Sequence, residues 1–343
     1  GGLEEKMGIH GNATCVMNYD GATGWLVGEE HKGMRTMFVM MNEARLGVGM
    51  QGLAQASIAY QGAADFARER LQGRSITGAK EPDKPADPII VHPDVRRMLM
   101  DTKAFVEGAR AFCYWMAVQA DLAEVAPDET TRQQAEDRMG LMTPVIKAYF
   151  TAHGVQAVSD SLQLYGGAGF TREQGVEQTL RDARISMIYE GTNGIQALDL
   201  VGRKLAANGG RAVFQFFSDV DDFVSSHEND DAMALYVEGM KGALSHLKDA
   251  TMWLMKNGMS NFDNAGAASH DYLELFGLTA MGLVWGRMAA VAKEKSGGGD
   301  AFYKHKLATA EYFFRRVLPD AASYVAKVKT GAEPVMALPA DAF

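Results

Sequence analysis

Between residues 34 and 74, apolar and small side chains recur at intervals of three and four residues, which is the period of one face of a helix. Alanine and glycine are frequent on that face and let neighbouring helices approach closely. The same periodicity predicts further helices over residues 94–125, 131–164, 173–184 and 192–206. Four prolines within residues 75–93 exclude a helix there, so this segment is predicted to be a loop.

A second helical block follows a predicted break. The segment ANGGR at residues 207–211 contains two glycines and an asparagine, which separate helical segments. Beyond it, the apolar spacing predicts helices over about 211–226, 231–257, 268–296 and 301–330. Their connections are rich in Asn, Asp and Gly, which suits antiparallel neighbours in a bundle. The tail from Thr330 is expected to be irregular.

The first 33 residues have a different pattern. Residues 13–19 and 24–28 are short, contain β-branched or aromatic residues, and lie between turn residues. Two strands alone do not form a stable sheet, so we interpret residues 1–33 as the tail of a β domain or as a strand pair that leans on the helices. The predicted fold is therefore mainly α. It has a helical bundle over 34–206, a second helical bundle over 207–343 and a short β remnant at the N-terminus.

Composition narrows the class of protein. Hydrophobic residues make up 47% and charged residues 22%, which excludes a disordered chain. The net charge is −9, so we expect no nucleic-acid partner. Cys15 and Cys113 are the only cysteines, which excludes a disulfide scaffold and predicts a reducing, cytoplasmic location. The histidines show no spacing typical of metal ligands, so no metal site is predicted. We expect no membrane span.

The segment that carries candidate chemistry is RDARISMIYEGTNGIQALDLVGRKL, residues 181–205. Glu190 lies at a turn before a helix that Thr192 would cap. On the residues alone, Glu190 is either a solvated turn residue near a helix N-terminus or a general base. The first is the commoner outcome for such a residue. The apolar neighbours of Glu190 support the second, because burial raises the pKa of a carboxyl group toward the range that a general base needs.

IYEGTNGIQ is very similar to the segment around the catalytic glutamate of the acyl-CoA dehydrogenases, which are FAD-dependent. Three further segments resemble that family in the same order: MNEAR (41–45), RERLQGR (68–74) and LQLYGGAGF (162–170). KMGIHGN through GWLVGEEHKGM resembles the last strands of the family's central β domain. The block at 211–330 resembles the C-terminal extension of a larger subgroup, which includes bacterial enzymes acting on 3-methylthiopropanoyl-CoA.

The resemblance implies α,β-dehydrogenation of an acyl-CoA thioester. Glu190 would remove the α-proton while flavin N5 accepts the β-hydride. The backbone N–H of Glu190 would stabilise the developing enolate. The positions that match substrate contacts are Asn42, Glu43, Ala44, Arg45, Tyr189 and Gly191.

The resemblance also implies an FAD site. The positions that match FAD contacts are Arg70, Gln72, Gln163, Gly166, Gly167, Thr192 and Asn193. In the family some of these contacts reach the FAD of a neighbouring subunit, which implies a homodimer or a dimer of dimers. An electron-transferring flavoprotein is the implied electron acceptor. Gly194 stands where many members have glutamine, so one adenine contact is lost or moves to Asn193.

The family's N-terminal helical domain and most of its β domain have no counterpart in these 343 residues. We therefore expect the chain to be a fragment that binds FAD poorly and is inactive alone. An alternative is a non-catalytic interaction module built on the same fold. A DNA-binding version is disfavoured because residues 206–343 carry 13 Lys and Arg against 17 Asp and Glu. A peripheral membrane anchor would need a Lys/Arg-rich helix face, which is not evident.

Overall fold

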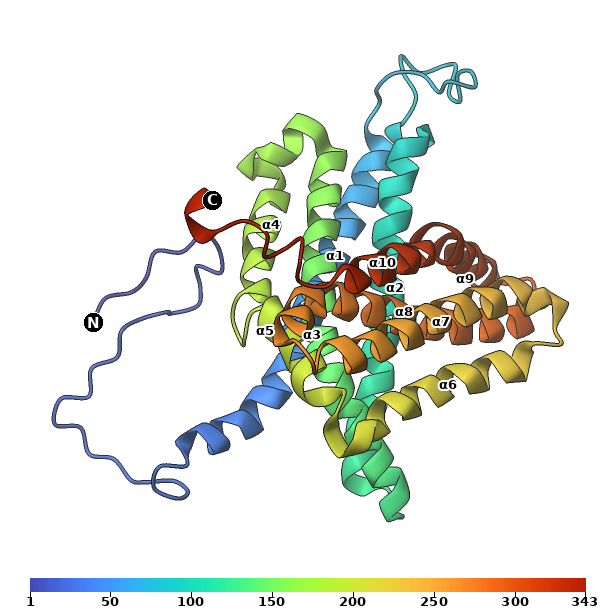
Figure 1. The fold of residues 1–343 in the computed structure, drawn as a ribbon. Helices are drawn as coiled ribbons and strands as arrows, with labels where there is room; N and C mark the ends of the chain where they lie inside the picture. The colour runs from blue at the N-terminus through green and yellow to red at the C-terminus, as the bar shows by residue number, and fades with distance from the viewer.

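The computed structural model describes residues 1–343, apart from the side chains of Val39 and Asn42. The described chain folds into ten α-helices joined by loops and short 3-10 or π turns (Figure 1). The prediction of a mainly α fold is confirmed. The helices are α1 (Gly33–Glu69), α2 (Pro93–Val125), α3 (Glu129–Tyr165), α4 (Val176–Arg184), α5 (Asn193–Asp199), α6 (Arg211–His227), α7 (Ala234–Asn257), α8 (Phe262–Ser296), α9 (Ala301–Tyr312) and α10 (Ala321–Thr330).

The predicted β remnant is wrong. Residues 1–32 form an extended loop that contacts α4, where the N–H of Ile9 donates to Asp182 Oδ1 and Arg181 donates to Met7 O. The strands expected at 13–19 and 24–28 do not form (Figure 1). An isolated bridge between Leu3 and Cys15 is the β pairing that the structure describes within this segment. The residue pattern suits strands, but a strand needs neighbours to pair with, and the described chain provides none here. Trp25 is accordingly 84% exposed.

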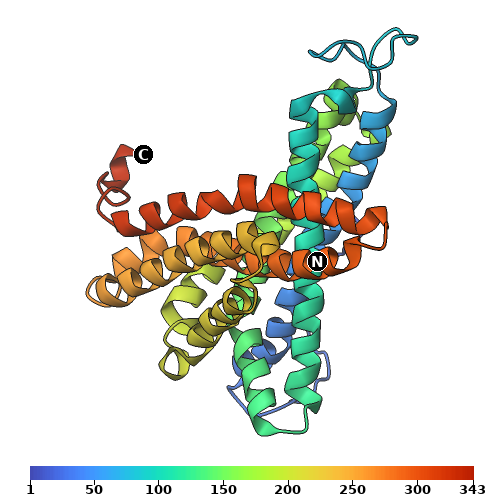
Figure 2. The same ribbon diagram turned by 90° about the vertical axis from the view of Figure 1, so that its right-hand side faces the viewer.

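Helices α1, α2 and α3 form an upright bundle (Figure 2). Gly52 of α1 lies against Phe150 of α3, and Phe66 stacks near Tyr165 with ring centroids 4.5 Å apart. The contacts advance in the same direction along both helices, so α1 and α3 run parallel. Two glycines make this close approach possible, because a Cβ on Gly154 would lie 2.6 Å from the carbonyl oxygen of Gly52.

The first long helix ends at Glu69, five residues earlier than the periodicity predicts. Arg70 adopts an extended conformation, and the next residues pair with the end of the loop. The N–H of Gln72 donates to Asp87 O over 2.9 Å, and the N–H of Asp87 donates to Gly73 O over 2.9 Å. The proline-rich segment is thus an ordered loop that projects from the end of the bundle (Figure 1).

Helices α7 to α10 lie across the upright bundle (Figure 2). Helix α8 is long and apolar enough to cross a membrane by length and composition, but 78% of its most apolar window is buried inside the protein. It is the central helix of this layer. Its Trp285 is fully buried, and the indole Nε1 donates to Ala104 O of α2 over 3.1 Å. The two helical layers therefore share a core.

The predicted break between the blocks coincides with three consecutive left-handed residues. Asn208, Gly209 and Gly210 have φ values of 50°, 70° and 82°. Glycine adopts this conformation without steric cost, which explains why the chain turns here between α5 and α6.

Candidate functional site

The turn that contains Glu190 lies between a 3-10 turn at Ile185–Met187 and the start of α5. Glu190 and Gly191 both have positive φ, 58° and 81°. This left-handed conformation is unusual for a residue with a side chain and persists only where the surroundings hold it. The hydroxyl of Thr192 accepts the N–H of Ile195 over 3.3 Å, so Thr192 is the N-cap that the sequence predicts.

Three side chains hold the turn through its carbonyl oxygens. Arg45 Nε of α1 donates to Glu190 O over 3.2 Å, and Lys147 Nζ of α3 donates to Gly191 O over 2.7 Å. Gln196 Nε2 of α5 lies 3.3 Å from Glu190 O and 3.2 Å from Gly191 O. Helices from three parts of the chain therefore converge on these two peptide groups.

The carboxylate of Glu190 is left without a partner. Its Oε2 is buried and makes no hydrogen bond within the described chain. Arg45 is nearest to a different carboxylate, with Nη1 4.0 Å from Asp199 Oδ2. A buried polar atom without a partner is rare in proteins and marks a site where a ligand or water is expected.

Lys147 is the strongest feature of the site that the sequence reasoning missed. Its side chain is fully buried. The pKa of Lys147 is lowered to about 8, chiefly by burial and also by the nearby positive charge of Arg45, while the charge of Glu190 opposes the shift. A lysine between Val145, Ile146 and Ala148 in an apolar stretch could have identified it, because lysine is almost never fully buried without partners.

The residues predicted to contact substrate do not all lie together. Glu43 and Arg45 line a cavity of about 430 Å³ with Thr143, Pro144 and Asp199. Tyr189 donates its hydroxyl to Gln51 Oε1, and burial raises its pKa.

The remaining substrate predictions differ in how far the structure places them. Ala44 is half-buried next to Arg45. The side chain of Asn42 lies outside the described residues, so its prediction receives no structural placement.

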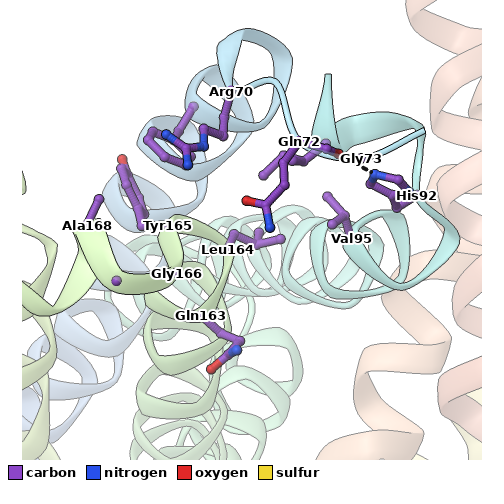
Figure 3. Close-up of a pocket in the computed structure, with 13 residues that line it drawn as sticks. Arg70, Gln72, Gly73, His92, Val95, Gln163, Leu164, Tyr165, Gly166 and Ala168 are labelled. Carbon is purple, nitrogen blue, oxygen red and sulfur yellow. Dashed lines mark hydrogen bonds between the residues drawn. The ribbon is translucent and has the colours of Figure 1, made fainter. Parts of the chain in front are cut away.

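A second hollow lies at the far end of the bundle, and it brings together five residues predicted to contact FAD. This cavity of about 650 Å³, called here the Arg70 pocket, is lined by the end of α1, the start of α2 and the end of α3 (Figure 3). The five predicted residues in its lining are Arg70, Gln72, Gln163, Gly166 and Gly167.

The Arg70 pocket has the shape and charge that an anionic ligand needs. A Cβ built on Gly166 or Gly167 would meet no atom within 4 Å, so the absence of side chains there leaves room in the pocket. Arg70 adds a guanidinium, which pairs well with phosphate oxygens. His92 Nε2 lies 3.0 Å from Gln72 O and fixes the edge of the pocket (Figure 3).

Asn193 is placed differently from the other predicted FAD residues. Its Oδ1 accepts from Lys147 Nζ over 3.0 Å and from Thr151 Oγ1 over 3.1 Å, and its Nδ2 donates to Ala148 O over 3.1 Å. The Asn193 side-chain amide therefore binds the start of α5, next to the Glu190 turn, to α3. Thr192 is exposed beside it.

The Glu190 turn and the Arg70 pocket are far apart. Along α1, the 25 residues from Arg45 to Arg70 correspond to about 37 Å. Along α3, the 16 residues from Lys147 to Gln163 correspond to about 24 Å. One copy of the chain thus presents two separate half-sites, one beside the middle of α3 and one at its C-terminal end.

Solved structures show the same fold as this chain. The chain superposes on an acyl-CoA dehydrogenase of Bacillus anthracis complexed with FAD with a TM-score of 0.74. The match covers 96% of this chain and 56% of that one at 19% identity. The Caenorhabditis elegans protein ACDH-11, in complex with C11-CoA, gives the same TM-score at 16% identity and covers 97% of this chain and 53% of that one.

Sequence comparison identifies the family. The family model described as "Acyl-CoA dehydrogenase, C-terminal domain" matches residues 31–205, and "Acetyl-CoA dehydrogenase C-terminal like" matches residues 216–339. The chain belongs to the acyl-CoA dehydrogenase family.

Two curated relatives give the extent of the match. The 3-methylmercaptopropionyl-CoA dehydrogenase of Ruegeria pomeroyi is 41% identical over 92% of this chain and 54% of that protein. A broad-specificity linear acyl-CoA dehydrogenase of Mycobacterium tuberculosis is 33% identical over 99% of this chain and 58% of that protein. The chain thus spans about half the length of these relatives.

Proposed function

We propose that this chain supplies the C-terminal half of an FAD-dependent acyl-CoA dehydrogenase in which Glu190 is the catalytic base. The observation that carries the proposal is the carboxylate of Glu190, which has a buried oxygen without a partner on a turn that is held from three sides. A general base must be free to take a proton, and a carboxylate tied into an ion pair would be a weaker base.

The geometry of the turn accounts for the proton transfer. Glu190 would take the α-proton of the thioester onto its unpartnered Oε2. The structure describes no acceptor within the chain for the backbone N–H of Glu190. This N–H is therefore free to donate to the thioester oxygen, where negative charge develops as the proton leaves. When bound, FAD supplies the acceptor for the β-hydride.

The residues of the Arg70 pocket fit part of the FAD. Arg70 would pair with the diphosphate, and Gln72 and Gln163 would donate to polar atoms of the dinucleotide. The open backbone at Gly166 and Gly167 would let the ligand approach closely. Thr192 and Asn193 stay predictions for the FAD bound near Glu190, with Asn193 acting there through its backbone because its amide is already engaged.

The separation of the two half-sites supports a homo-oligomer. A distance of roughly 24 to 37 Å is too long for Glu190 and Arg70 of one copy to contact neighbouring parts of one ligand. We therefore propose that the Arg70 pocket of one subunit serves the FAD that lies beside Glu190 of another.

The substrate would be an acyl-CoA thioester. The cavity beside Glu43 and Arg45 adjoins the Glu190 turn, since Arg45 belongs to both. We propose that it receives part of the acyl-CoA, and that a 3-methylthiopropanoyl or other short acyl group is the first substrate to test. An electron-transferring flavoprotein is the proposed electron acceptor.

The decisive experiment uses the full-length protein that carries this chain, loaded with FAD. A panel of acyl-CoA thioesters is added without oxygen while flavin absorbance is followed. We expect bleaching by the wild type and none by Glu190→Gln, which keeps the size of the side chain but removes the base. Glu228→Gln, at an exposed position after α6, is the matched control and should bleach like the wild type.

The other outcomes have distinct meanings. Equal bleaching by the wild type and Glu190→Gln would show that Glu190 is not the base. A wild type that retains FAD but bleaches with no thioester would refute the enzyme proposal and favour the non-catalytic interaction module.

A further inference from the structure

Lys147 is a buried cation whose hydrogen bonds reach the Glu190 turn. It projects from the middle of α3, and its side chain is 0% exposed. Its ammonium donates to Gly191 O over 2.7 Å and to Asn193 Oδ1 over 3.0 Å. These acceptors are 44 and 46 residues away in the chain, so the contact joins two separate elements. Burying a charge is costly, and a lysine is kept at such a place only with partners.

One partner of Lys147 belongs to the unusual backbone itself, and the other follows it by two residues. Glu190 and Gly191 have positive φ, and Glu190 has a side chain that disfavours this conformation. Arg45 holds the carbonyl of Glu190, and Lys147 holds the next carbonyl along the chain. With its two carbonyls fixed from α1 and α3, the turn keeps one orientation, and the carboxylate and N–H of Glu190 keep theirs.

Arg45 and Lys147 hold the backbone of the Glu190 turn without forming, in the part of the chain that the structure describes, an ion pair with the Glu190 carboxylate. The charged groups that face Glu190 are Arg45 from α1, Lys147 from α3 and Asp199 from α5. Within the described residues, neither cation forms an ion pair with the Glu190 carboxylate, and both use backbone oxygens instead. The two cations thus hold the backbone of the turn and leave free the carboxylate oxygen that would take the proton.

We propose that Lys147 is a positioning residue for the base: its bonds to Gly191 O and Asn193 Oδ1 hold Glu190 in the left-handed conformation with its carboxylate free. The effect on catalysis rests on the proposed function, whereas the effect on the turn does not. Lys147 touches no substrate atom in this scheme and acts through Glu190.

The test combines two measurements on the full-length protein, loaded with FAD. Lys147→Met keeps the length of the side chain and removes its charge and its donors. Hydrogen exchange of the backbone amides in residues 186–200 should become at least tenfold faster in this variant. Exchange in α7 should stay unchanged. Lys241→Met, at an exposed position on α7, is the matched control and should leave residues 186–200 as in the wild type.

The kinetic arm separates a positioning role from a general loss of stability. In Lys147→Met, kcat should fall on the order of 100-fold, the cost of misplacing a catalytic group by about 1 Å, while KM changes by less than about threefold. Lys147→Arg restores charge and donors and should return kcat to within about tenfold of the wild type.

Each result supports or overturns the inference. Exchange and kcat of Lys147→Met equal to the wild type would refute it. If the wild type reacts with no thioester, the proposed function fails, and the exchange data alone decide the role of Lys147 in the turn. If Lys147→Met does not fold, Lys147→Arg is compared with Lys147→Gln, which has donors but no charge. Equal kcat in this pair would overturn the inference.

Discussion

Because α1 packs closely on α3, we predict that replacing two glycines of α1 by alanine changes the free energy of unfolding in opposite directions. Gly52 and Gly47 both lie inside α1. A Cβ on Gly52 would lie 2.5 Å from Phe150 O, 2.9 Å from Phe150 C and 3.0 Å from Thr151 Cα. All three are backbone atoms, which cannot rotate away. A Cβ on Gly47 would meet nothing within 4 Å.

The expected magnitudes follow from two opposing effects. Replacing glycine by alanine inside a helix stabilises it by about 1 kcal/mol, because glycine loses more backbone freedom on folding. Gly47→Ala should gain this amount. At Gly52 the new methyl group forces two long helices apart, and overpacking of this kind costs up to about 3 kcal/mol. Gly52→Ala should therefore lower the free energy of unfolding by about 2 kcal/mol, which places the two variants about 3 kcal/mol apart.

The assay is urea unfolding of this chain followed by far-ultraviolet circular dichroism, with wild type and both variants compared at one temperature. The midpoint should rise for Gly47→Ala and fall for Gly52→Ala, with similar slopes because similar surface is exposed. Gly154→Ala disturbs the same contact from the other helix, so its effect should not add to that of Gly52→Ala. Stabilisation by Gly52→Ala equal to that by Gly47→Ala would refute the claim that these glycines set the spacing of α1 and α3.

Two further predictions concern the projecting loop and the oligomer. The Asp87 carboxylate accepts hydrogen bonds from the N–H groups of Ser75, Glu81 and Lys80, and these bonds lower its pKa to about 2. The ordered loop should therefore be stable above about pH 4 and loosen as the pH falls from 4 to 2. Asp87→Asn should speed tryptic cleavage after Lys80 at neutral pH. If Glu190 of one subunit and Arg70 of another share one FAD, co-expressed Glu190→Gln and Arg70→Ala chains should form hybrid oligomers with one intact site. These hybrids should regain activity that neither variant has alone. Isolated hybrids without activity would contradict the shared site.

The helices could be predicted from the sequence because their apolar spacing reflects burial against neighbours that belong to the same chain. α2 begins and ends within one residue of its predicted range. α3 is longer than its own predicted range by two residues at the start and one at the end. The early end of α1 could not be predicted, since it depends on pairing between Gln72 and Asp87, which are distant along the loop. The predicted β remnant is wrong for the opposite reason. Its residues suit strands, but a strand forms only where other strands pair with it, and the local residue pattern does not supply those strands.

The candidate site, too, could be predicted from the sequence only in part. Glu190 and the residues of the Arg70 pocket were found by resemblance to a family, and the structure brings five of the pocket residues together. Lys147 and Gln196 were missed because their importance lies in contacts with carbonyl oxygens of other residues, which leave no motif. A charged residue inside an apolar helical stretch is the sequence feature that would have pointed to Lys147.

The parallel packing of α1 and α3 connects these observations. Arg45 and Lys147 are fixed to the Glu190 turn within the two helices, and Arg70 and Gln163 meet at the C-terminal ends of the helices. Gly52 and Gly154 lie between these two places, so the spacing they allow sets the position of Arg45 relative to Lys147. A shift of α1 against α3 would pull apart Arg45 and Lys147, which donate to the two carbonyl oxygens of the turn, before it changed the carboxylate itself. The backbone contact at these glycines is therefore a structural condition for the geometry of the base, although neither glycine approaches Glu190.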